Sequence, residues 1–355
     1  MLAGNVNGVG EAFNNATSYI RRNMVLWGFV FDYPEFVDYL GDRRKTVVDL
    51  QSQENTLVLV GQSSVPTGTV LGDIKELYLV GNWSPTGLDI AGCTGLVTLG
   101  MFDGGVGLDS DQRSKISSLV KGQKKLQNLI VMNWGGVEIA EGAFGSTSAS
   151  NSAKSLVKVI INKAISIQNE AFSRCENLIT VSIPDAVTIG ILSGSAYGPF
   201  EYCINLKTAS FPVAESIGNY AFYGCNALQA ASFPVAKEIG SYAFNCCYAL
   251  QAASFPIAEE IGVQAFYCCS ALQAASFPAA ESIGDKAFRY CTALQAASFP
   301  AATSISDYAF RNCPALQEIT YPQGASIDKR YAFYGCTQTI RILNPNGSLR
   351  ETYNG

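Results

Sequence analysis

One eight-residue segment, Ala-Leu-Gln-Ala-Ala-Ser-Phe-Pro, begins at Ala227, Ala249, Ala271 and Ala293 and therefore recurs at a fixed interval of 22 residues. A degenerate copy starts as early as Leu156. A fixed period of this length is typical of repeat architectures, in which one unit cannot bury its own apolar face and must stack on its neighbours. The repeat therefore predicts a solenoid, whereas length alone would suggest about two globular domains.

The first half of each repeat has the pattern of a short strand. In Leu-x-x-Ala-x-Phe, the first, fourth and sixth residues are apolar and are expected to face a core, and the third and fifth are expected to face water. The proline that follows has no N–H to donate to a neighbouring strand, so it ends the strand at the same edge in every unit.

The second half of each repeat reads Ile-Gly-x-x-Ala-Phe-x-x-Cys, as from Ile217 to Cys225. Apolar residues spaced by three to five predict a return turn with a short helical or 3₁₀ segment. The glycine after the isoleucine is a natural site for positive φ. Together the two halves predict an α/β repeat solenoid with one short parallel strand in each 22-residue coil.

The chain is expected to have four parts. Residues 1–50 carry no repeat but have apolar residues at helical intervals, which predicts a helical N-terminal cap. Residues 51–135 keep only the strand half and are expected to form irregular leucine-rich coils. Residues 136–338 contain the regular coils, and residues 339–355 are expected to form a C-terminal cap strand.

The two halves of the repeat, taken over about residues 126–338, resemble the BspA-type leucine-rich repeat family. The resemblance implies a curved, right-handed leucine-rich solenoid. It also implies a bacterial protein, on the cell surface or secreted, that adheres to host proteins or to other cells. It supplies no identified ligand.

Composition excludes several classes of function. The chain has no histidine, which removes Ser-His-Asp and Cys-His nucleophile systems and histidine-containing metal sites. A formal charge of −5 makes nucleic acid an unexpected partner. Neither a signal peptide nor a transmembrane segment is visible, since the apolar stretch Met24–Phe31 is too short to span a bilayer.

Cysteines recur every 22 residues from Cys203 to Cys313. We expect buried thiols that act as small apolar residues, because parallel neighbouring side chains fit the torsion of a disulfide poorly. A second possibility is a zinc site made by the vicinal pairs Cys246-Cys247 and Cys268-Cys269, although their spacing is not that of a zinc ribbon or finger.

No other pattern indicates a metal, a cofactor or a catalytic residue. Asp103, Asp109 and Asp111 lie in a glycine-rich segment that does not follow the EF-hand order, so a solvated acidic turn is favoured over a calcium site. No Walker A or Gly-x-Ser-x-Gly sequence is present.

The outward residues of the strand segment form the candidate binding surface. Its third and fifth positions carry alanine and serine, and a glutamine stands at its edge. The candidate ligand-binding residues are Gln229, Ser232, Gln251, Ser254, Gln273, Ser276, Gln295 and Ser298. Such a small, nearly uncharged surface suits an extended protein or glycan. The alternative is a sheet selected only for stacking.

A second candidate stripe lies in the return half of the repeat. Tyr220, Tyr242 and Tyr308 stand directly before Ala-Phe and could stack on sugars or shield the coil.

These patterns favour a non-enzymatic binding or adhesion module that recognises a protein or glycan. The alternative is a structural spacer or appendage component of a cell envelope or phage tail, in which near-identical coils set length. A hydrolase is a third possibility and would need carboxylates in the irregular coils or insertions.

Overall fold

The computed structural model describes residues 55–60, 71–80, 83, 88, 90, 92–102, 107–194 and 197–354. The predicted N-terminal cap, residues 1–50, lies outside this part of the chain. The described residues belong to two compact units, the first within 1–137 and 155–164, and the second within 138–154 and 165–355.

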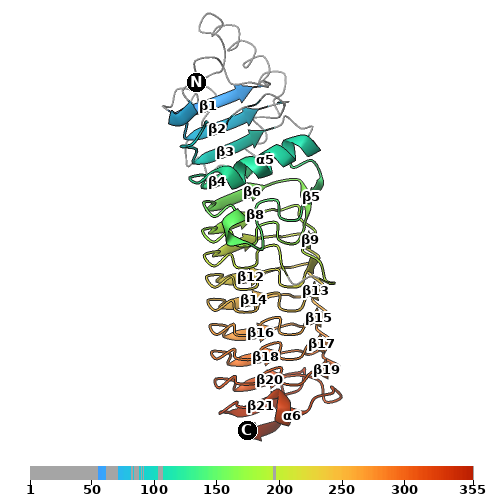
Figure 1. Ribbon diagram of the computed structural model, residues 1–355. Helices are drawn as coiled ribbons and strands as arrows, with labels where there is room; N and C mark the ends of the chain where they lie inside the picture. Colours follow the sequence, from blue (N-terminus) through green and yellow to red (C-terminus); the bar gives the residue numbers. More distant parts are fainter. Residues whose placement is uncertain are drawn as a thin grey trace, which may run out of the picture. The chain divides into compact units, whose positions relative to one another are not determined.

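Unit 1 contains a sheet of parallel strands that follow one another in chain order (Figure 1). The strands are β1 (Thr56–Val60), β2 (Glu76–Val80), β3 (Thr98–Phe102), β4 (Asn128–Val131) and β6 (Lys158–Ile161). A 3₁₀ helix, η2 (Leu71–Asp73), precedes β2. Leucine and valine residues of the strands are buried on one face of this sheet, and Tyr78, Ile130 and Ile160 are buried on the other.

The longest helix of the described residues, α5 (Ser110–Gly122), also belongs to unit 1. It begins at Asp109, whose side chain accepts a hydrogen bond from the backbone of Gln112, while the Gln112 side chain accepts one from the backbone of Asp109. This capping box satisfies two backbone donors at the start of the helix. Asp109 is therefore the N-cap of a helix, and the interpretation of this residue as part of an acidic turn is wrong.

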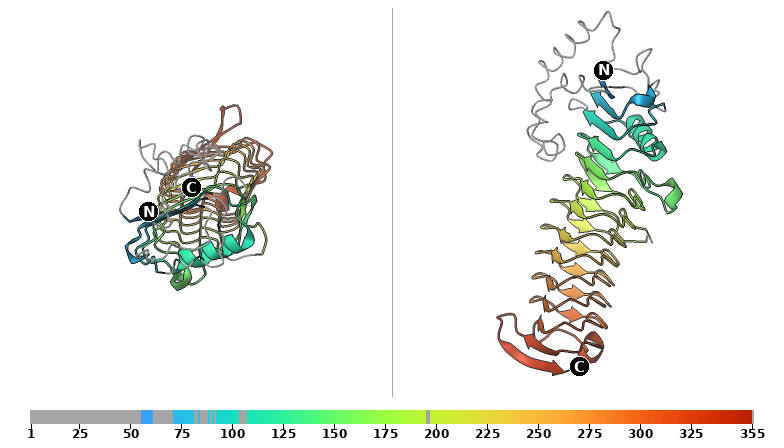
Figure 2. Two further views of the ribbon diagram at one scale, coloured as in Figure 1. Left: turned by 90° about the horizontal axis from the view of Figure 1, so that it is seen from above. Right: turned by 90° about the vertical axis from the view of Figure 1, so that its left-hand side faces the viewer.

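Unit 2 is a stack of coils, each with two strand segments (Figures 1 and 2). We call the longer set the first ladder. It comprises β8 (Thr180–Ser182), β10 (Thr208–Ser210), β12 (Ala230–Ser232), β14 (Ala252–Ser254), β16 (Ala274–Ser276), β18 (Ala296–Ser298), β20 (Glu318–Thr320) and β21 (Thr339–Leu343). The last strand, β22 (Leu349–Asn354), pairs antiparallel with β21.

The shorter set, which we call the second ladder, runs along another edge of the same coils. It comprises β7 (Ala164–Ile167), β9 (Thr188–Ile189), β11 (Ser216–Ile217), β13 (Glu238–Ile239), β15 (Glu260–Ile261), β17 (Ser282–Ile283) and β19 (Ser304–Ile305). Strand β5 (Val137–Ile139) is the terminal strand of the same sheet, and the 3₁₀ helix η3 (Ala149–Asn151) lies between β5 and β7 in the chain.

The solenoid predicted from the repeat is confirmed, with two additions. The isoleucine of Ile-Gly belongs to the second ladder, so each regular coil has two strands where one was predicted. The return segment consists of successive single turns, since the N–H of Tyr223 bonds to the carbonyl of Tyr220 (3.0 Å) and that of Cys225 to Phe222 (3.1 Å). Left-handed backbone at Tyr220 (φ 57°) and Gly224 (φ 69°) prevents these turns from continuing as a 3₁₀ helix. The final coil has the short helix α6 (Lys329–Ala332).

The prediction of positive φ for the glycine after the isoleucine is wrong for the regular coils. Gly218, Gly240 and Gly262 do not have positive φ. A Cβ atom on Gly240 would lie 2.6 Å from the backbone nitrogen of Asn219 in the preceding coil, and one on Gly262 would lie 2.5 Å from the carbonyl carbon of Gly240. The glycines are therefore required by the close approach of neighbouring coils.

Two ladders of phenylalanine rings fill the core of the regular coils. The rings of Phe222, Phe244 and Phe266 stack with 5.2 Å between successive centroids, and their planes are within 8° of parallel. Phe233 and Phe255, from the strand half of the repeat, belong to the other phenylalanine stack, with 5.4 Å between centroids. All of these rings are buried. The core thus repeats with the sequence, and neighbouring coils present equivalent surface positions in register.

Candidate binding surface

The outward residues of the first ladder form a surface of small, nearly uncharged side chains, which we call the strand face. Ser232, Ser254 and Ser276 are exposed, as are the alanines two residues before them, while Ala231 and Ala275 between them are buried. This alternation follows from the pleat of a strand, whose successive side chains point to opposite faces. Glutamine side chains at Gln229, Gln251, Gln273 and Gln295 are also exposed at the edge of this face.

The strand face ends where the side chains change. Ser182 of β8 is buried, and Ser298 of β18 is only half-exposed. In β20, Glu318 replaces the alanine of the regular coils. The exposed Ala-x-Ser pattern thus extends through β12, β14 and β16, and Thr208 and Ser210 of β10 are exposed at the equivalent positions.

An apolar ridge borders the strand face. Val213, Val235 and Ile257 follow the strand-ending prolines of three consecutive coils, and 43 %, 37 % and 39 % of their surfaces are exposed. The prolines themselves are exposed as well. Sequence reasoning used these prolines only as strand terminators and missed the ridge, although the repeated Pro-Val and Pro-Ile pairs were visible.

The predicted tyrosine stripe is a mixed ladder. The rings of Tyr220 and Tyr242 stack with their centroids 4.7 Å apart. In the next coil Gln264 donates a hydrogen bond to the Tyr242 hydroxyl (3.1 Å), and further along the ammonium group of Lys286 lies 5.7 Å from the centroid of Tyr308. All five residues are half-buried and have positive φ.

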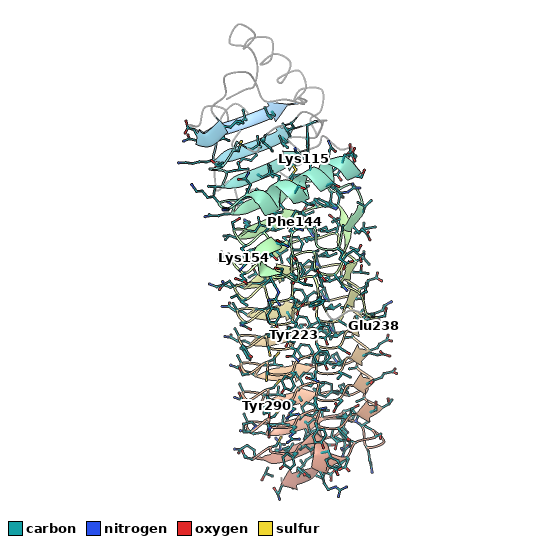
Figure 3. All side chains as sticks on the ribbon, viewed as in Figure 1. Lys115, Phe144, Lys154, Tyr223, Glu238 and Tyr290 are labelled. Carbon is teal, nitrogen blue, oxygen red and sulfur yellow. The ribbon has the colours of Figure 1, made fainter. Side chains whose placement is uncertain are left out.

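A second aromatic position, missed by the sequence reasoning, lies directly after the Ala-Phe pair. Tyr223 and Tyr267 occupy this position. Each packs edge to face against a tyrosine that stands one residue further along its own coil, Tyr202 at 5.3 Å and Tyr290 at 5.6 Å between ring centroids. Figure 3 shows Tyr223 and Tyr290 away from the edge at which Glu238 of the second ladder lies. These residues vary from coil to coil, so the repeat consensus does not reveal them.

The cysteine ladder is buried and hydrogen-bonded. Each thiol donates to the carbonyl of a phenylalanine in the preceding coil, as from Cys247 to Phe222 and from Cys269 to Phe244, both at 3.2 Å. Burial raises the pKa of both thiols well above the ordinary value. The prediction that the thiols are buried is confirmed. In addition to packing, each thiol provides a hydrogen bond to a buried backbone carbonyl, which was not predicted.

The four-thiolate zinc site is not formed. Cys247 and Cys269 direct their sulfur atoms to carbonyls in the core, whereas the neighbouring Cys246 and Cys268 are half-exposed. Across the described residues, no group of three or more Asp, Glu or Cys side chains is placed to hold a metal ion. For the calcium alternative, Asp109 caps α5 and Asp103 lies outside the described residues.

One buried carboxylate stands apart from the polar surface. Glu201 is 5 % exposed, and its Oε2 atom has no hydrogen-bond partner. Burial raises the pKa of this carboxyl group to about 7, against the opposing effects of Arg174 and of a backbone hydrogen bond from Gly198. The neighbouring carboxylate of Glu170 also raises this pKa.

The regular coils and the C-terminal strands match a known repeat family. The model of the "BspA type Leucine rich repeat region" matches residues 137–256, 195–301 and 259–354, which together cover more than half of the chain. The chain belongs to the BspA-type leucine-rich repeat family. Proteins with such repeats are typically protein-interaction or adhesion modules. No curated protein matches the sequence.

Several solved structures are similar to this BspA-type chain. A protein from Bacteroides ovatus is 20 % identical with a TM-score of 0.39, and the match covers 74 % of this chain and 77 % of that one. A cell surface protein from Faecalibacterium prausnitzii is 18 % identical with a TM-score of 0.31, covering 82 % and 78 %. The pneumococcal vaccine antigen PcpA is 14 % identical with a TM-score of 0.40, covering 78 % and 70 %. Similarity at this level carries no information about ligands.

Within the described residues, no helix of this BspA-type repeat protein is both long and apolar enough to cross a membrane.

Proposed function

We propose that this chain is a non-enzymatic binding module of a bacterial cell surface and that the strand face binds an extended segment of a partner protein. The observation that carries the proposal is the strand face itself. Small exposed residues recur there in register through β12, β14 and β16, between the glutamine row and the apolar ridge. Membership of the BspA-type family, whose repeats typically serve interaction or adhesion, supports it.

The chemistry of the strand face suits close approach of an extended partner. Backbone groups of neighbouring strands pair with one another, as between Ala252 and Ala230, so the face offers side chains for recognition. Alanine and serine project little, which lets a partner's backbone reach van der Waals distance. Serine hydroxyls and glutamine amides both donate and accept hydrogen bonds, and the ridge adds apolar area beside them.

The test is binding of the full chain to a panel of immobilised extracellular-matrix proteins and neutral glycans. The variant carries Ser232→Glu, Ser254→Glu and Ser276→Glu, which place three charges on the strand face. A matched control carries Ser216→Glu, Ser282→Glu and Ser304→Glu in the second ladder, where Glu238 and Glu260 already occupy the equivalent positions. Thermal melting of both variants verifies that they fold.

We expect saturable binding to at least one protein, lost in the strand-face variant and kept in the control. Binding that survives the strand-face substitutions would place the site elsewhere. Saturable binding only to glycans would change the class of ligand, and no binding to any member of the panel would favour the structural spacer.

A further inference from the structure

Two arginines occupy equivalent positions in consecutive coils, outside the strand face. Arg289 and Arg311 each follow the phenylalanine of Ala-Phe and are 22 residues apart. The phenylalanines before them, Phe288 and Phe310, are buried and stack with 5.4 Å between centroids, which fixes the spacing of the two coils at this point. A hydrogen bond from the N–H of Tyr290 to the carbonyl of Arg311 (3.0 Å) joins the same two turns.

The Arg289 guanidinium is held by tyrosines. Its central carbon lies 4.8 Å from the ring centroid of Tyr290 and 5.8 Å from that of Tyr267. One terminal nitrogen donates to the Tyr290 hydroxyl at 3.1 Å. A guanidinium held by stacking and a hydrogen bond loses less conformational freedom when it binds a ligand, so the arginine is preorganised.

Arg311 has the same kind of environment in the next coil. Its guanidinium carbon lies 4.7 Å from the ring centroid of Tyr334 and 5.1 Å from that of Tyr308. Tyr334 is 57 % exposed, so one ring of the arrangement remains open to a ligand. The Nε atoms of both arginines are buried without a hydrogen-bond partner, which leaves the terminal nitrogens as the groups that a ligand can reach.

Neither arginine is neutralised within the part of the chain that the structure describes. Neighbouring basic residues pair with carboxylates, as Arg330 does with Asp328 (3.1 Å) and Lys329 with Glu351 (2.6 Å). The ion pairs of the described residues include neither Arg289 nor Arg311. Two like charges on adjacent coils repel each other, and an anionic group placed between them removes that repulsion while accepting charge-assisted hydrogen bonds.

We propose that Arg289 and Arg311, together with Tyr267, Tyr290, Tyr308 and Tyr334, form a binding site for the anionic groups of an acidic polysaccharide. The arginines bind sulfate or carboxylate groups, and the exposed ring of Tyr334 stacks on the apolar face of a sugar. This site is independent of the strand face and does not rest on the function proposed for it.

The spacing favours a polysaccharide over an acidic peptide. In an extended peptide, side chains on one side recur at about 6.8 Å, because each residue advances the chain by about 3.4 Å. The coils that carry the two arginines are 5.4 Å apart at the stacked rings of Phe288 and Phe310. This spacing is shorter than the peptide repeat and closer to the length of one sugar residue along a polysaccharide.

The test measures binding of fluorescently labelled heparin, hyaluronan and neutral dextran to the full chain at low salt by fluorescence polarisation. Heparin carries sulfates and hyaluronan only carboxylates, so the two arms identify which anionic group is bound. The variant is Arg289→Gln with Arg311→Gln, which removes two charges and keeps most of each side-chain stem. The matched control, Arg330→Gln with Arg341→Gln, removes two charges that are paired with Asp328 and Glu318.

We expect binding to at least one acidic polysaccharide and none to dextran, with affinity falling as salt is raised. The double variant should bind at least tenfold more weakly at unchanged melting temperature, and the control within twofold of the wild type. Equal binding by the variant, or no binding to either acidic polymer, would overturn the proposal. Tighter binding of polyglutamate or of single-stranded DNA would overturn the ligand class.

The strand-face variant separates this site from the proposed function. With Ser232, Ser254 and Ser276 changed to glutamate, binding of the acidic polysaccharide should persist within twofold, and its loss would contradict an independent site. Failure of the arginine site leaves the protein-binding test of the strand face unaffected, because that test uses a different variant and different ligands.

Discussion

The fifth residue of the strand repeat has opposite surroundings in the two units. In unit 1 this position carries Tyr78, Ile130 and Ile160, whose side chains are at most 2 % exposed. In the regular coils of unit 2 the same position carries Ser232 or Ser254, and both are exposed. Inward residues such as Leu129 in unit 1 and Phe233 in unit 2 are buried in both units. The same strand pattern thus occurs in a sheet that is buried on both faces and in a sheet that is exposed on one face. The residue at the fifth position is large and apolar in the first sheet and is serine in the second.

The largest effect that tests this contrast is expected from Ile130→Ala. Because Ile130 is fully buried, the substitution should lower the free energy of unfolding by about 2–5 kcal/mol through lost apolar contact and a residual cavity. Ser254→Ala, the matched change in β14, should alter it by no more than about 0.5 kcal/mol, since the serine is exposed. Urea unfolding followed by circular dichroism measures both.

Comparable costs at Ile130 and Ser254 would remove the distinction between a covered and an open sheet. A small cost at both positions would show that the outer face of unit 1 is as open as the strand face of unit 2.

The regular coils could be predicted closely from the sequence because every position is repeated several times. The inward Leu, Ala and Phe of the strand half and the outward serines, such as Ser232, follow directly from alternation along a strand. The second ladder was missed because strands of two residues, such as Ser216–Ile217, are too short to show a periodic pattern. The repeated glycine was predicted to have positive φ. Its actual role, to allow the close approach of the preceding coil at Gly240, is not visible within one repeat.

Features that occur once, or that vary between coils, were harder to predict. Helix α5 was missed although Asp109 and Gln112 have the spacing of a capping box, because the aspartate was grouped with other acidic residues of a loop. Arg289 and Arg311 occupy a position that carries serine, glutamate, tyrosine or asparagine in other coils, so a consensus hides them. Each arginine also packs against a tyrosine ring of a neighbouring coil, and this contact exists only because the coils lie in register.

A pH-dependent effect should distinguish the coil that contains Glu201 from the regular coils, which carry Tyr223 or Tyr267 at the same position. The pKa of Glu201 is raised to about 7 by burial, so the folded protein retains a proton that the unfolded chain releases near its ordinary pKa. This contribution to stability is present below that ordinary pKa and is lost as pH rises toward 7, with a slope of at most about 1.4 kcal/mol per pH unit.

Glu201→Gln removes the titrating group and keeps the shape of the side chain. The difference in unfolding free energy between variant and wild type, measured from pH 4 to pH 8, should shift in favour of the variant as pH rises. A difference that stays constant with pH would show that Glu201 is solvated and ionised in the folded protein.

The smallest expected effect is a difference in chemical reactivity between adjacent cysteines of one coil, of which one side chain points outward and the next points into the core. Cys246 and Cys268 are half-exposed, whereas Cys247 and Cys269 are buried and bonded to backbone carbonyls. Brief treatment of the native protein with iodoacetamide, followed by peptide mass spectrometry, should therefore modify the first two and leave the second two intact until the protein is unfolded. The pKa of Cys268 is raised to about 11, chiefly by desolvation and by the Cys246 thiol, so its reaction should accelerate as pH approaches that value. If Cys247 reacted as fast as Cys246 in the native protein, the core of the regular coils would have to open readily. The difference between buried and exposed positions would then not hold even within one coil.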